Sequence, residues 1–315
     1  MNLKKPELKS TRQGYGEALL EIGKDERIVV LTADLTESTK TDLFEKKYPE
    51  RFLQCGVAEQ NMVGMAAGLA LSGKIPFAST FAAFIPNRAL DQVRVSVCYN
   101  NANVKFGITH AGLTVGEDGA THQALEDIAT MRVLPNMTVI VPCDYEEAKK
   151  ATKEAAKITG PVYLRLGRSN IPIITNSNSS FKIGKAEILK TGKDVTIIAC
   201  GIMVYEALIA AEELSKNGIN AEVINCHTIK PIDEKMIVGS AKKTGALVSA
   251  EEHQVNGGLG SAVAEVLAKN SPTPMEFVGV KNVFGESGKS EELLKKYGLT
   301  HKEIITAAKK VIKRK

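Results

Sequence analysis

The sequence predicts an α/β protein of two domains, each built on a mostly parallel sheet covered by helices. Short apolar runs rich in Val and Ile alternate with longer helical patterns throughout the chain. Strands that alternate with helices form parallel sheets with helices on both faces. The Ser- and Asn-rich stretch TNSNSSFKIGK interrupts the alternation and is typical of a linker. We therefore expect domains at residues 1–175 and 186–315, joined by residues 176–185.

The first domain is expected to contain five short strands with helices between them. A helical pattern covers residues 145–159, with Lys and Glu on one side and Ala on the other. A second, largely apolar helix is expected to begin near Glu59. Apolar, β-branched runs predict strands at residues 27–33, 75–80, 104–109, 137–142 and 161–167.

The second domain repeats the alternation, although its sequence does not repeat that of the first. Two further helices are expected between the last strand and the C-terminus. Its strands are predicted at residues 194–201, 219–226, 245–251 and 275–280, with helices at residues 204–218, 233–245 and 257–270.

Charge and composition exclude some classes of partner. The 41 basic and 36 acidic residues give a net charge of +5, spread over helix faces and the C-terminal tail. Nucleic-acid binding would need a concentrated basic stripe with stacking aromatic residues, and the sequence has neither. A mild positive bias suits an anionic small substrate instead.

The sequence predicts neither a membrane span nor a secretion signal. The longest apolar run, near Met62–Leu71, is about half of the roughly 20 residues that a spanning helix needs. The first residues have no apolar core and no small-residue cleavage pattern. Five scattered cysteines without a C-x-x-C pair suit reduced thiols, so we expect a cytoplasmic protein.

Ligands of parallel sheets lie beyond the carboxyl ends of the strands, and three segments there are unusual. In GVAEQNMVGMAAGLALSG, Glu59 starts an otherwise apolar helix, and helix capping alone would account for it. Phe81 and Phe84 have helical spacing, which is typical of core residues but also suits a platform for a ligand.

The third segment, THAGLTVGEDGATHQALEDIA, combines glycines with ionisable side chains. Its His, Glu and Asp side chains are all potential metal ligands, yet their spacing matches no metal motif. Alternatively, the glycines let the backbone approach a ligand to which the side chains form hydrogen bonds. The ionisable residues between Thr109 and His122 are His110, Glu117, Asp118 and His122.

Taken together and in order, these segments resemble the C-terminal two-thirds of transketolase. The resemblance spans nearly the whole chain and implies a pyrimidine-binding domain followed by a transketolase C-terminal domain, with thiamine diphosphate as the cofactor. It is carried by the stretches STRQGYGEALLEIG, DERIVVLTADLTEST, GVAEQNM, STFAAF, GEDGATHQALEDIA, LRLGRSNIP, TIKPID and GGLGSAVAEVL.

The resemblance assigns the cofactor's pyrimidine end to this chain. It implies that Glu59 hydrogen-bonds N1′ of the aminopyrimidine and helps to remove the C2 proton of the thiazolium. A carboxylic acid in an apolar pocket, with its pKa raised by desolvation, suits that task. Phe84 would stack on the aminopyrimidine, while Phe81 and His122 would line the same pocket. FAAFIPNRALDQ is one residue longer than the corresponding segment of close relatives.

The resemblance also implies a site for a sugar phosphate. His110, Asp118 and His122 would hold the ketose hydroxyls and the oxyanion, with the two histidines counted as catalytic. The phosphate contacts would come from Arg12, Ser38 and Arg168.

The family's G-D-G motif, whose domain holds the metal, does not occur in the sequence. We therefore expect this chain to be the C-terminal subunit of a split transketolase. It would hold no metal itself, while a separate N-terminal subunit would hold Mg²⁺ or Ca²⁺ against the diphosphate. Pyrimidine domains would pair with each other, which gives a two-plus-two heterotetramer. The activity would be ketol transfer from a ketose phosphate to an aldose phosphate, as in the pentose phosphate pathway.

Other functions remain open at this stage. The beta subunit of a 2-oxo acid dehydrogenase first component has the same domain order and an equivalent glutamate. It would not need Arg12, Arg168 or the HAGLTVGEDGATH loop. A deoxyxylulose-phosphate synthase fragment and a non-catalytic partner of a thiamine enzyme are further alternatives.

Overall fold

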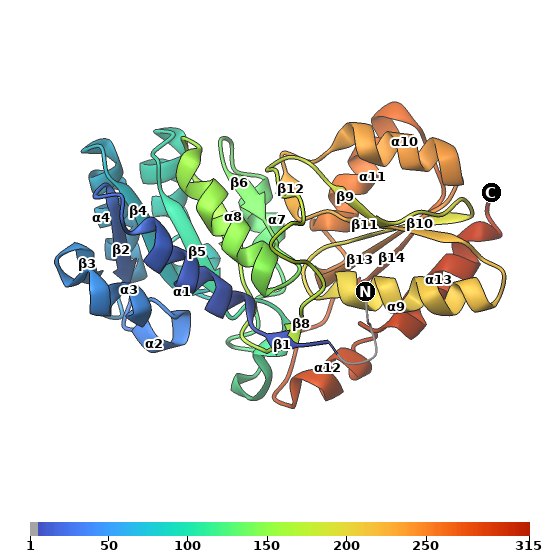
Figure 1. The fold of residues 1–315 in the computed structure, drawn as a ribbon, viewed down its shortest axis with the longest axis horizontal. Coiled ribbons are helices and arrows are strands. Elements are labelled where there is room, and N and C mark those ends of the chain that lie inside the picture. Colours follow the sequence, from blue (N-terminus) through green and yellow to red (C-terminus); the bar gives the residue numbers. More distant parts are fainter. Residues whose placement is uncertain (1–5) are drawn as a thin grey trace.

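Two sheets lie side by side in the computed structural model, which describes residues 6–315 (Figure 1). The first has seven strands and the second has five, and a two-stranded pair, β1–β8, lies apart from both. The strands are β1 Leu8–Lys9, β2 Ile28–Thr32, β3 Phe52–Gln54, β4 Ile75–Phe81, β5 Lys105–Thr109, β6 Thr138–Ile140, β7 Val162–Arg165, β8 Ile171–Pro172, β9 Glu187–Lys190, β10 Val195–Ala199, β11 Ala221–Asn225, β12 Thr228–Lys230, β13 Leu247–Gln254 and β14 Met275–Val280.

The helices cover both sheets, as the strand–helix alternation predicts. Three short elements are not α-helical: η1 and η3 are 3₁₀ turns, and η2 has π-helical hydrogen bonding. The helical segments are α1 Thr11–Ile22, α2 Thr36–Thr39, α3 Asp42–Lys47, η1 Pro49–Arg51, α4 Glu59–Leu71, α5 Ile85–Arg88, α6 Leu90–Gln92, η2 Val93–Tyr99, η3 Leu113–Asp118, α7 Asp127–Arg132, α8 Tyr145–Lys157, α9 Met203–Lys216, α10 Glu234–Thr244, α11 Leu259–Asn270, α12 Ser290–Lys296 and α13 His301–Ile312.

The first sheet has the order β12-β6-β7-β5-β4-β2-β3, and all its pairings except β12–β6 are parallel. Strands β2, β4, β5 and β7 are buried along their whole length, because helices cover both faces. Helices α1 and α8 pack together on one face (Figure 1). Helix α4 and η2 belong to the core on the other face.

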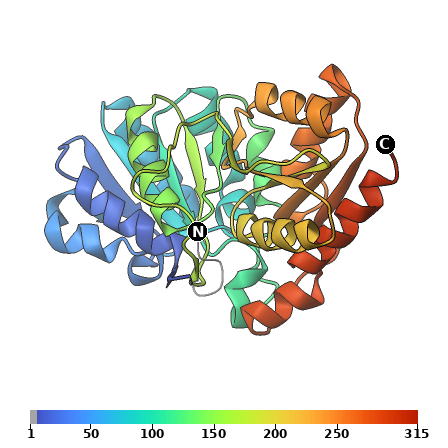
Figure 2. The ribbon, with the colours of Figure 1, turned by 45° about the vertical axis from the view of Figure 1, so that its right-hand side comes forward.

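The second sheet has the order β14-β13-β10-β11-β9, with only β9 antiparallel. Helices α9 and α13 lie on one side of it, and α10 and α11 lie together on the other (Figures 1 and 2). The predicted fold class, two mostly parallel sheets covered by helices, is therefore confirmed. No helix within residues 6–315 is long and apolar enough to cross a membrane.

The two sheets are more closely joined than the sequence indicates. Strand β12 lies beyond the linker in the chain, yet it completes the first sheet by pairing Thr228 with Ile140 of β6. One apolar cluster contains side chains of both sheets, among them Val139 and Ile224. A three-residue strand has too little periodicity to be recognised, so sequence analysis did not predict this exchange.

Two carboxylates secure the junction of the domains at the start of α8. Asp144 caps the helix by accepting from Glu147 N at 2.8 Å, and it also accepts from the backbone of Ile174 and Thr175. Glu147 is 2% exposed. Its carboxylate accepts from Cys143 N at 2.6 Å and from Asn225 Nδ2, on the second sheet, at 2.7 Å.

We predict that Glu147 makes stability depend on pH. Burial raises the pKa of Glu147 from 4.5 to about 7. The folded protein therefore retains this proton where the unfolded chain has lost it, so stability falls as pH rises from about 4.5 to 7, by about 3 kcal/mol. Gln at this position can accept from Cys143 N. Once the Asn225 amide turns over, it can also donate to Asn225 Oδ1, which is buried without a partner within residues 6–315. Glu147→Gln should therefore gain in melting temperature over the wild type across this pH range.

The control is Glu154→Gln, which removes a partly exposed carboxylate from the same helix. Its melting temperature should follow that of the wild type at every pH. Parallel curves for Glu147→Gln and the wild type between pH 4.5 and 7.5 would show that Glu147 does not titrate in this way.

Candidate functional site

The predicted site residues meet at the carboxyl edge of the first sheet. Glu59 is the first residue of α4, after β3, and Phe81 is the last residue of β4. His110 directly follows β5, and Arg168 follows β7 by three residues. Because β7, β5, β4, β2 and β3 are neighbours in one sheet, segments far apart in the sequence converge there.

Glu59 is buried at the start of α4, but its carboxylate binds a side chain of another helix instead of capping α4. Its side chain is 4% exposed, and α4 has no side-chain cap at Ala58. The Glu59 carboxylate instead accepts from Arg88 Nη1 at 3.1 Å. The surrounding pocket is partly polar, since it is lined by Gln60, Asn61 and Arg88 as well as by Val57 and Ala58. The sequence left the surroundings of this carboxylate open between an apolar pocket and a helix N-terminus, and the structure adds the Arg88 guanidinium of α5, which the sequence did not predict.

Aromatic rings connect Glu59 to the histidines. The Phe81 ring stacks on the His110 imidazole, with ring centres 3.7 Å apart, and on Phe84 at 5.6 Å. His122 lies edge-on to Phe81 at 6.5 Å and to Phe84 at 5.6 Å. The Arg88 guanidinium lies 4.1 Å from the centre of the Phe84 ring. Phe81 and Phe84 therefore contact ionisable groups as well as each other.

His110 is held in an uncommon conformation and stays neutral. Its φ is +57°, in the left-handed region, which costs energy for a residue with a side chain. The imidazole is 3% exposed, and its Nδ1 is 2.9 Å from Thr109 Oγ1. Burial lowers the pKa of His110 to about 3, and the charges of Arg12, Arg168 and His122 add to this effect. At neutral pH the ring can therefore form hydrogen bonds without carrying a charge.

Two arginines give the site a positive end. Arg12 Nη1 donates to the carbonyl of Ser38 at 2.8 Å, while its Nε is buried and has no hydrogen-bond partner within residues 6–315. Burial lowers the pKa of Arg12, and the charge of Arg168 lowers it further. Arg168 Nη1 lies 3.8 Å from Asp118 Oδ2 and donates to the carbonyl of Val115. Two guanidinium groups that repel each other, one with an unused donor, suit an anionic ligand.

The loop after β5 does not have the arrangement of a metal site. Glu117 has a side chain that is 70% exposed and lies 3.6 Å from Arg168 Nη1. Within residues 6–315, no three His, Cys, Asp or Glu side chains are grouped so that they could hold a metal ion.

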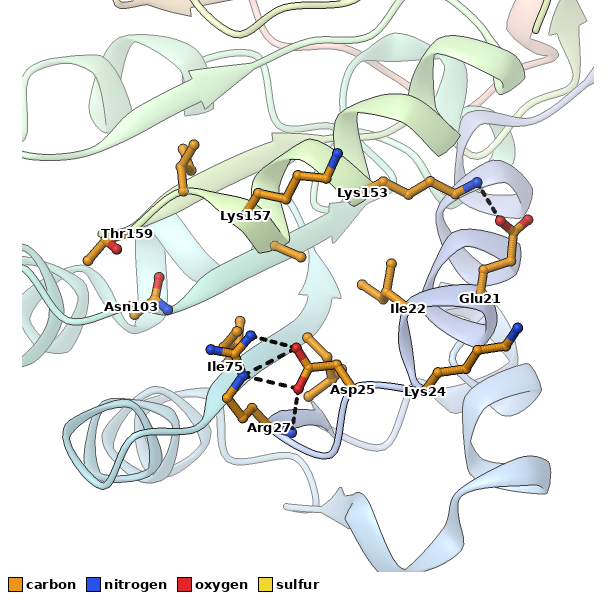
Figure 3. Close-up of a pocket in the computed structure, with 13 residues that line it drawn as sticks. Glu21, Ile22, Lys24, Asp25, Arg27, Ile75, Asn103, Lys153, Lys157 and Thr159 are labelled. Atoms are coloured by element: carbon orange, nitrogen blue, oxygen red, sulfur yellow. Dashed lines mark hydrogen bonds and ion pairs between the residues drawn. The ribbon is translucent and has the colours of Figure 1, made fainter.

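Another pocket lies at the amino ends of the same strands, away from this site (Figure 3). It is lined by Ile28 and Ile75, the first residues of β2 and β4. Two ion pairs lie among its lining residues, Arg27 with Asp25 and Lys153 with Glu21 (Figure 3). None of the predicted site residues lines it.

Sequence analysis missed Arg88, which contacts both Glu59 and Phe84. Its position four residues after Phe84 was the available signal, since i and i+4 side chains share one side of a helical turn.

The fold and the site define a two-domain α/β protein with a buried polar site at the carboxyl edge of its first sheet. Residues 8–173 match the transketolase pyrimidine binding domain, and residues 184–304 match the transketolase C-terminal domain. The chain belongs to the transketolase family, whose members are transferases that depend on thiamine diphosphate.

Relatives of similar length are subunits of transketolases. The chain is 49% identical over 305 residues to a 6-deoxy-6-sulfo-D-fructose transketolase subunit of Clostridium sp. (strain MSTE9), covering 96% of this chain and 95% of the relative. It is 39% identical to an apulose-4-phosphate transketolase subunit of Phocaeicola vulgatus, covering 96% of this chain and 97% of that relative.

A solved structure described as a split gene transketolase, inactive beta4 tetramer, has the same fold. It is 53% identical, with a TM-score of 0.91, and the match covers 96% of this chain and 98% of that one. These matches favour transketolase over the 2-oxo acid dehydrogenase alternative.

Proposed function

We propose that this chain is the C-terminal subunit of a two-subunit transketolase. Together with an N-terminal subunit, it transfers a two-carbon ketol unit from a ketose to an aldose. The observation that carries this proposal is the contact chain at the edge of the first sheet. There, the buried Glu59 carboxylate and the Phe84 ring share Arg88 as a neighbour, and the stacked rings lead on to His110.

The residues present fit the pyrimidine end of thiamine diphosphate, which supplies the carbanion chemistry when it is bound. Glu59 is buried and can share a proton with N1′ of the aminopyrimidine. Phe84 can stack on that ring, while Phe81 and His122 line its pocket. Arg88 contacts both Glu59 and Phe84, so its guanidinium would have to move aside for the ring to bind between them.

The remaining site residues suit a sugar with an anionic end. In this proposal, His110 and Asp118 form hydrogen bonds to the substrate hydroxyls, with His122 as the second histidine. Arg12 and Arg168 provide donors for the anion, beside Ser38. In the relatives, the named sugars carry a sulfo or a phosphate group. We therefore propose a phosphorylated ketose and aldose as donor and acceptor, as in the pentose phosphate pathway.

The diphosphate and its metal belong to the other half of the site in this proposal. An N-terminal subunit would supply the ligands for Mg²⁺ or Ca²⁺, and two copies of each chain would form a heterotetramer in the cytoplasm. Exposed apolar side chains on α4 and η2 offer a surface for self-association. The tetramer of beta subunits in the solved relative is described as inactive, which supports dependence on a partner. The exposed residues are Met65, Leu71, Val95 and Tyr99.

We predict that Glu59→Gln, assayed in the complex with its N-terminal subunit, lowers turnover roughly 10²- to 10⁴-fold. Glutamine keeps the size of the side chain but cannot exchange the proton. Ketol transfer is measured with xylulose 5-phosphate and ribose 5-phosphate. The control is Glu21→Gln, which removes a carboxylate that pairs with Lys149 and Lys153 at the opposite edge of the sheet. If Glu59→Gln is as active as that control, Glu59 has only a structural role.

We predict that Arg168→Ala raises KM for phosphorylated acceptors by roughly 10- to 100-fold, the scale of a lost charged hydrogen bond. Glycolaldehyde, which carries no anionic group, should keep nearly its original KM. Arg27→Ala, which removes an exposed arginine in the pocket of Figure 3, is the matched control and should change neither value. Equal losses on both acceptors would assign Arg168 to the structure of the loop alone.

A further inference from the structure

The second domain contributes none of the side chains assigned to cofactor or substrate, yet it contacts the loop that carries Asp118. Strand β13 extends into the junction of the domains and ends beside this loop. There, Glu252 is 6% exposed, and its Oε1 accepts from Thr114 N at 2.7 Å. Its backbone carbonyl accepts from Arg165 at 3.0 Å. A buried carboxylate of one domain thus binds the backbone of a loop in the other.

The loop is pressed against the second domain at both of its ends. Gly112, with φ +83°, leaves no room for a side chain, because a Cβ there would lie 2.3 Å from the Glu252 carboxyl carbon. At the other end, a Cβ on Gly119 would lie 2.5 Å from Ser287 Oγ. Figures 1 and 2 show this loop beside α12, and the two segments are in contact. The backbone of η3 is therefore shaped by residues of the second domain.

Hydrogen bonds from the second domain reach the backbone of Thr114 on both sides. Its N–H donates to Glu252, while its carbonyl accepts from Ser290 Oγ at 3.0 Å and, within the first domain, from Ser169 Oγ at 2.7 Å. Gln123 Nε2 donates to Gly116 O at 3.2 Å and to Glu286 O at 2.9 Å. These bonds together fix the path of the loop backbone.

This backbone in turn sets the position of the anion-binding side chains. Arg168 donates to the carbonyl of Val115, the residue after Thr114, and lies 3.8 Å from Asp118 Oδ2. A shift of Thr114 therefore moves the acceptor that orients Arg168. Such a chain of direct contacts runs from β13 to the guanidinium without any gap.

We propose that Glu252 is a positioning residue that holds the loop of residues 112–119, and through it Arg168 and Asp118, for the anionic end of the substrate. The substrate part of this proposal rests on the proposed function, whereas the hold on the loop does not. Glu252 touches no substrate atom itself. Its effect should therefore appear in affinity for anionic acceptors, with little change in the reaction at the cofactor.

The neighbouring Glu251 provides a matched control. It lies on the same strand, is 1% exposed, and also accepts backbone N–H groups, from Leu259 at 2.7 Å and Gly260 at 2.8 Å. These donors begin α11 within the second domain. Glu251→Ala and Glu252→Ala thus remove the same group from adjacent buried positions, but only Glu252 reaches the loop.

The first test is kinetic and uses the complex of both subunits. Glu252→Ala should raise KM for ribose 5-phosphate about tenfold, the scale of a lost buried hydrogen bond. KM for glycolaldehyde and kcat should stay within about twofold of the wild type, a margin small beside that effect. Glu252→Gln keeps an oxygen that can accept from Thr114 and should restore most of the affinity. Glu251→Ala should leave the ratio of the two KM values unchanged.

The second test is hydrogen exchange on the full chain, which needs no activity. Glu252→Ala should speed exchange in residues 111–119 and leave the start of α11 protected, while Glu251→Ala should do the reverse. Ser290→Ala removes a loop contact without opening a large cavity, so it serves if Glu252→Ala does not fold. It should raise KM for ribose 5-phosphate about threefold, a smaller effect than loss of the carboxylate contact.

The outcomes separate this inference from the proposed function. Unchanged exchange in residues 111–119, equal effects on both acceptors, or a Glu252→Gln variant as impaired as Glu252→Ala would each overturn the role of Glu252. If the wild-type complex transfers no ketol unit, the proposed function fails, and exchange still decides whether Glu252 holds the loop.

Discussion

The buried ion pair of Arg165 and Asp127 is the interaction on which both the domain junction and the site depend. Arg165 Nε donates to Asp127 Oδ2 at 2.8 Å, and the Tyr163 hydroxyl donates to the same oxygen at 2.9 Å. Arg165 Nη2 donates to the carbonyl of Glu252 in the second domain at 3.0 Å and to the carbonyl of Ala124 at 3.4 Å. Burial alone would lower the pKa of Arg165, but Asp127 outweighs this effect and raises it.

Burying a guanidinium costs free energy unless hydrogen bonds satisfy its donors. The ion pair therefore constrains the positions of the groups that Arg165 contacts, which are Asp127, Ala124 and Glu252. Arg165 ends β7, which places the pair directly beneath the carboxyl edge of the first sheet. Asp127 begins α7, just after the loop that carries His122. Removing either partner would leave an uncompensated buried charge. It would also disturb the hydrogen bonds by which Arg165 joins the loop before α7 to β13.

Two different groups of side chains lie apart from each other at the carboxyl ends of the strands, next to this ion pair. Glu59, Phe84 and Arg88 lie at one end, where a buried carboxylate and an aromatic ring are available. Arg12 and Arg168 lie at the other, where positive charge gathers. The neutral, stacked His110 lies between the two ends, close to Phe81. This order suits the proposed function, in which the aminopyrimidine of the cofactor binds at one end and the anionic end of the sugar binds at the other.

The local pattern of the sequence predicted much of this structure. Buried β-branched runs gave β2, β4, β5 and β10 at nearly their observed bounds, because full burial leaves continuous apolar segments. Motifs pointed to Glu59, Phe81 and His110, and these do converge at the edge of the sheet. Their assigned roles in cofactor and substrate binding remain predictions.

What the sequence did not reveal depends on contacts between distant residues. Strand β12 crosses to the other sheet, and Glu252 meets Thr114 across 138 positions. Arg88 reaches Glu59 over 29 positions from the short helix α5. Periodicity reports only which face of an element is buried, so it carries no signal for such pairings.

The central claim is that this chain holds only half of a cofactor site, and the most direct measurement is calorimetric titration of thiamine diphosphate with Mg²⁺. The chain alone, the N-terminal subunit alone and their mixture are compared. We predict tight binding only in the mixture, with subunit association strengthened by the cofactor, because the ligand binds the assembled state. Tight binding by this chain alone, shown by mass spectrometry to be free of partner and turning over xylulose 5-phosphate, would contradict the account.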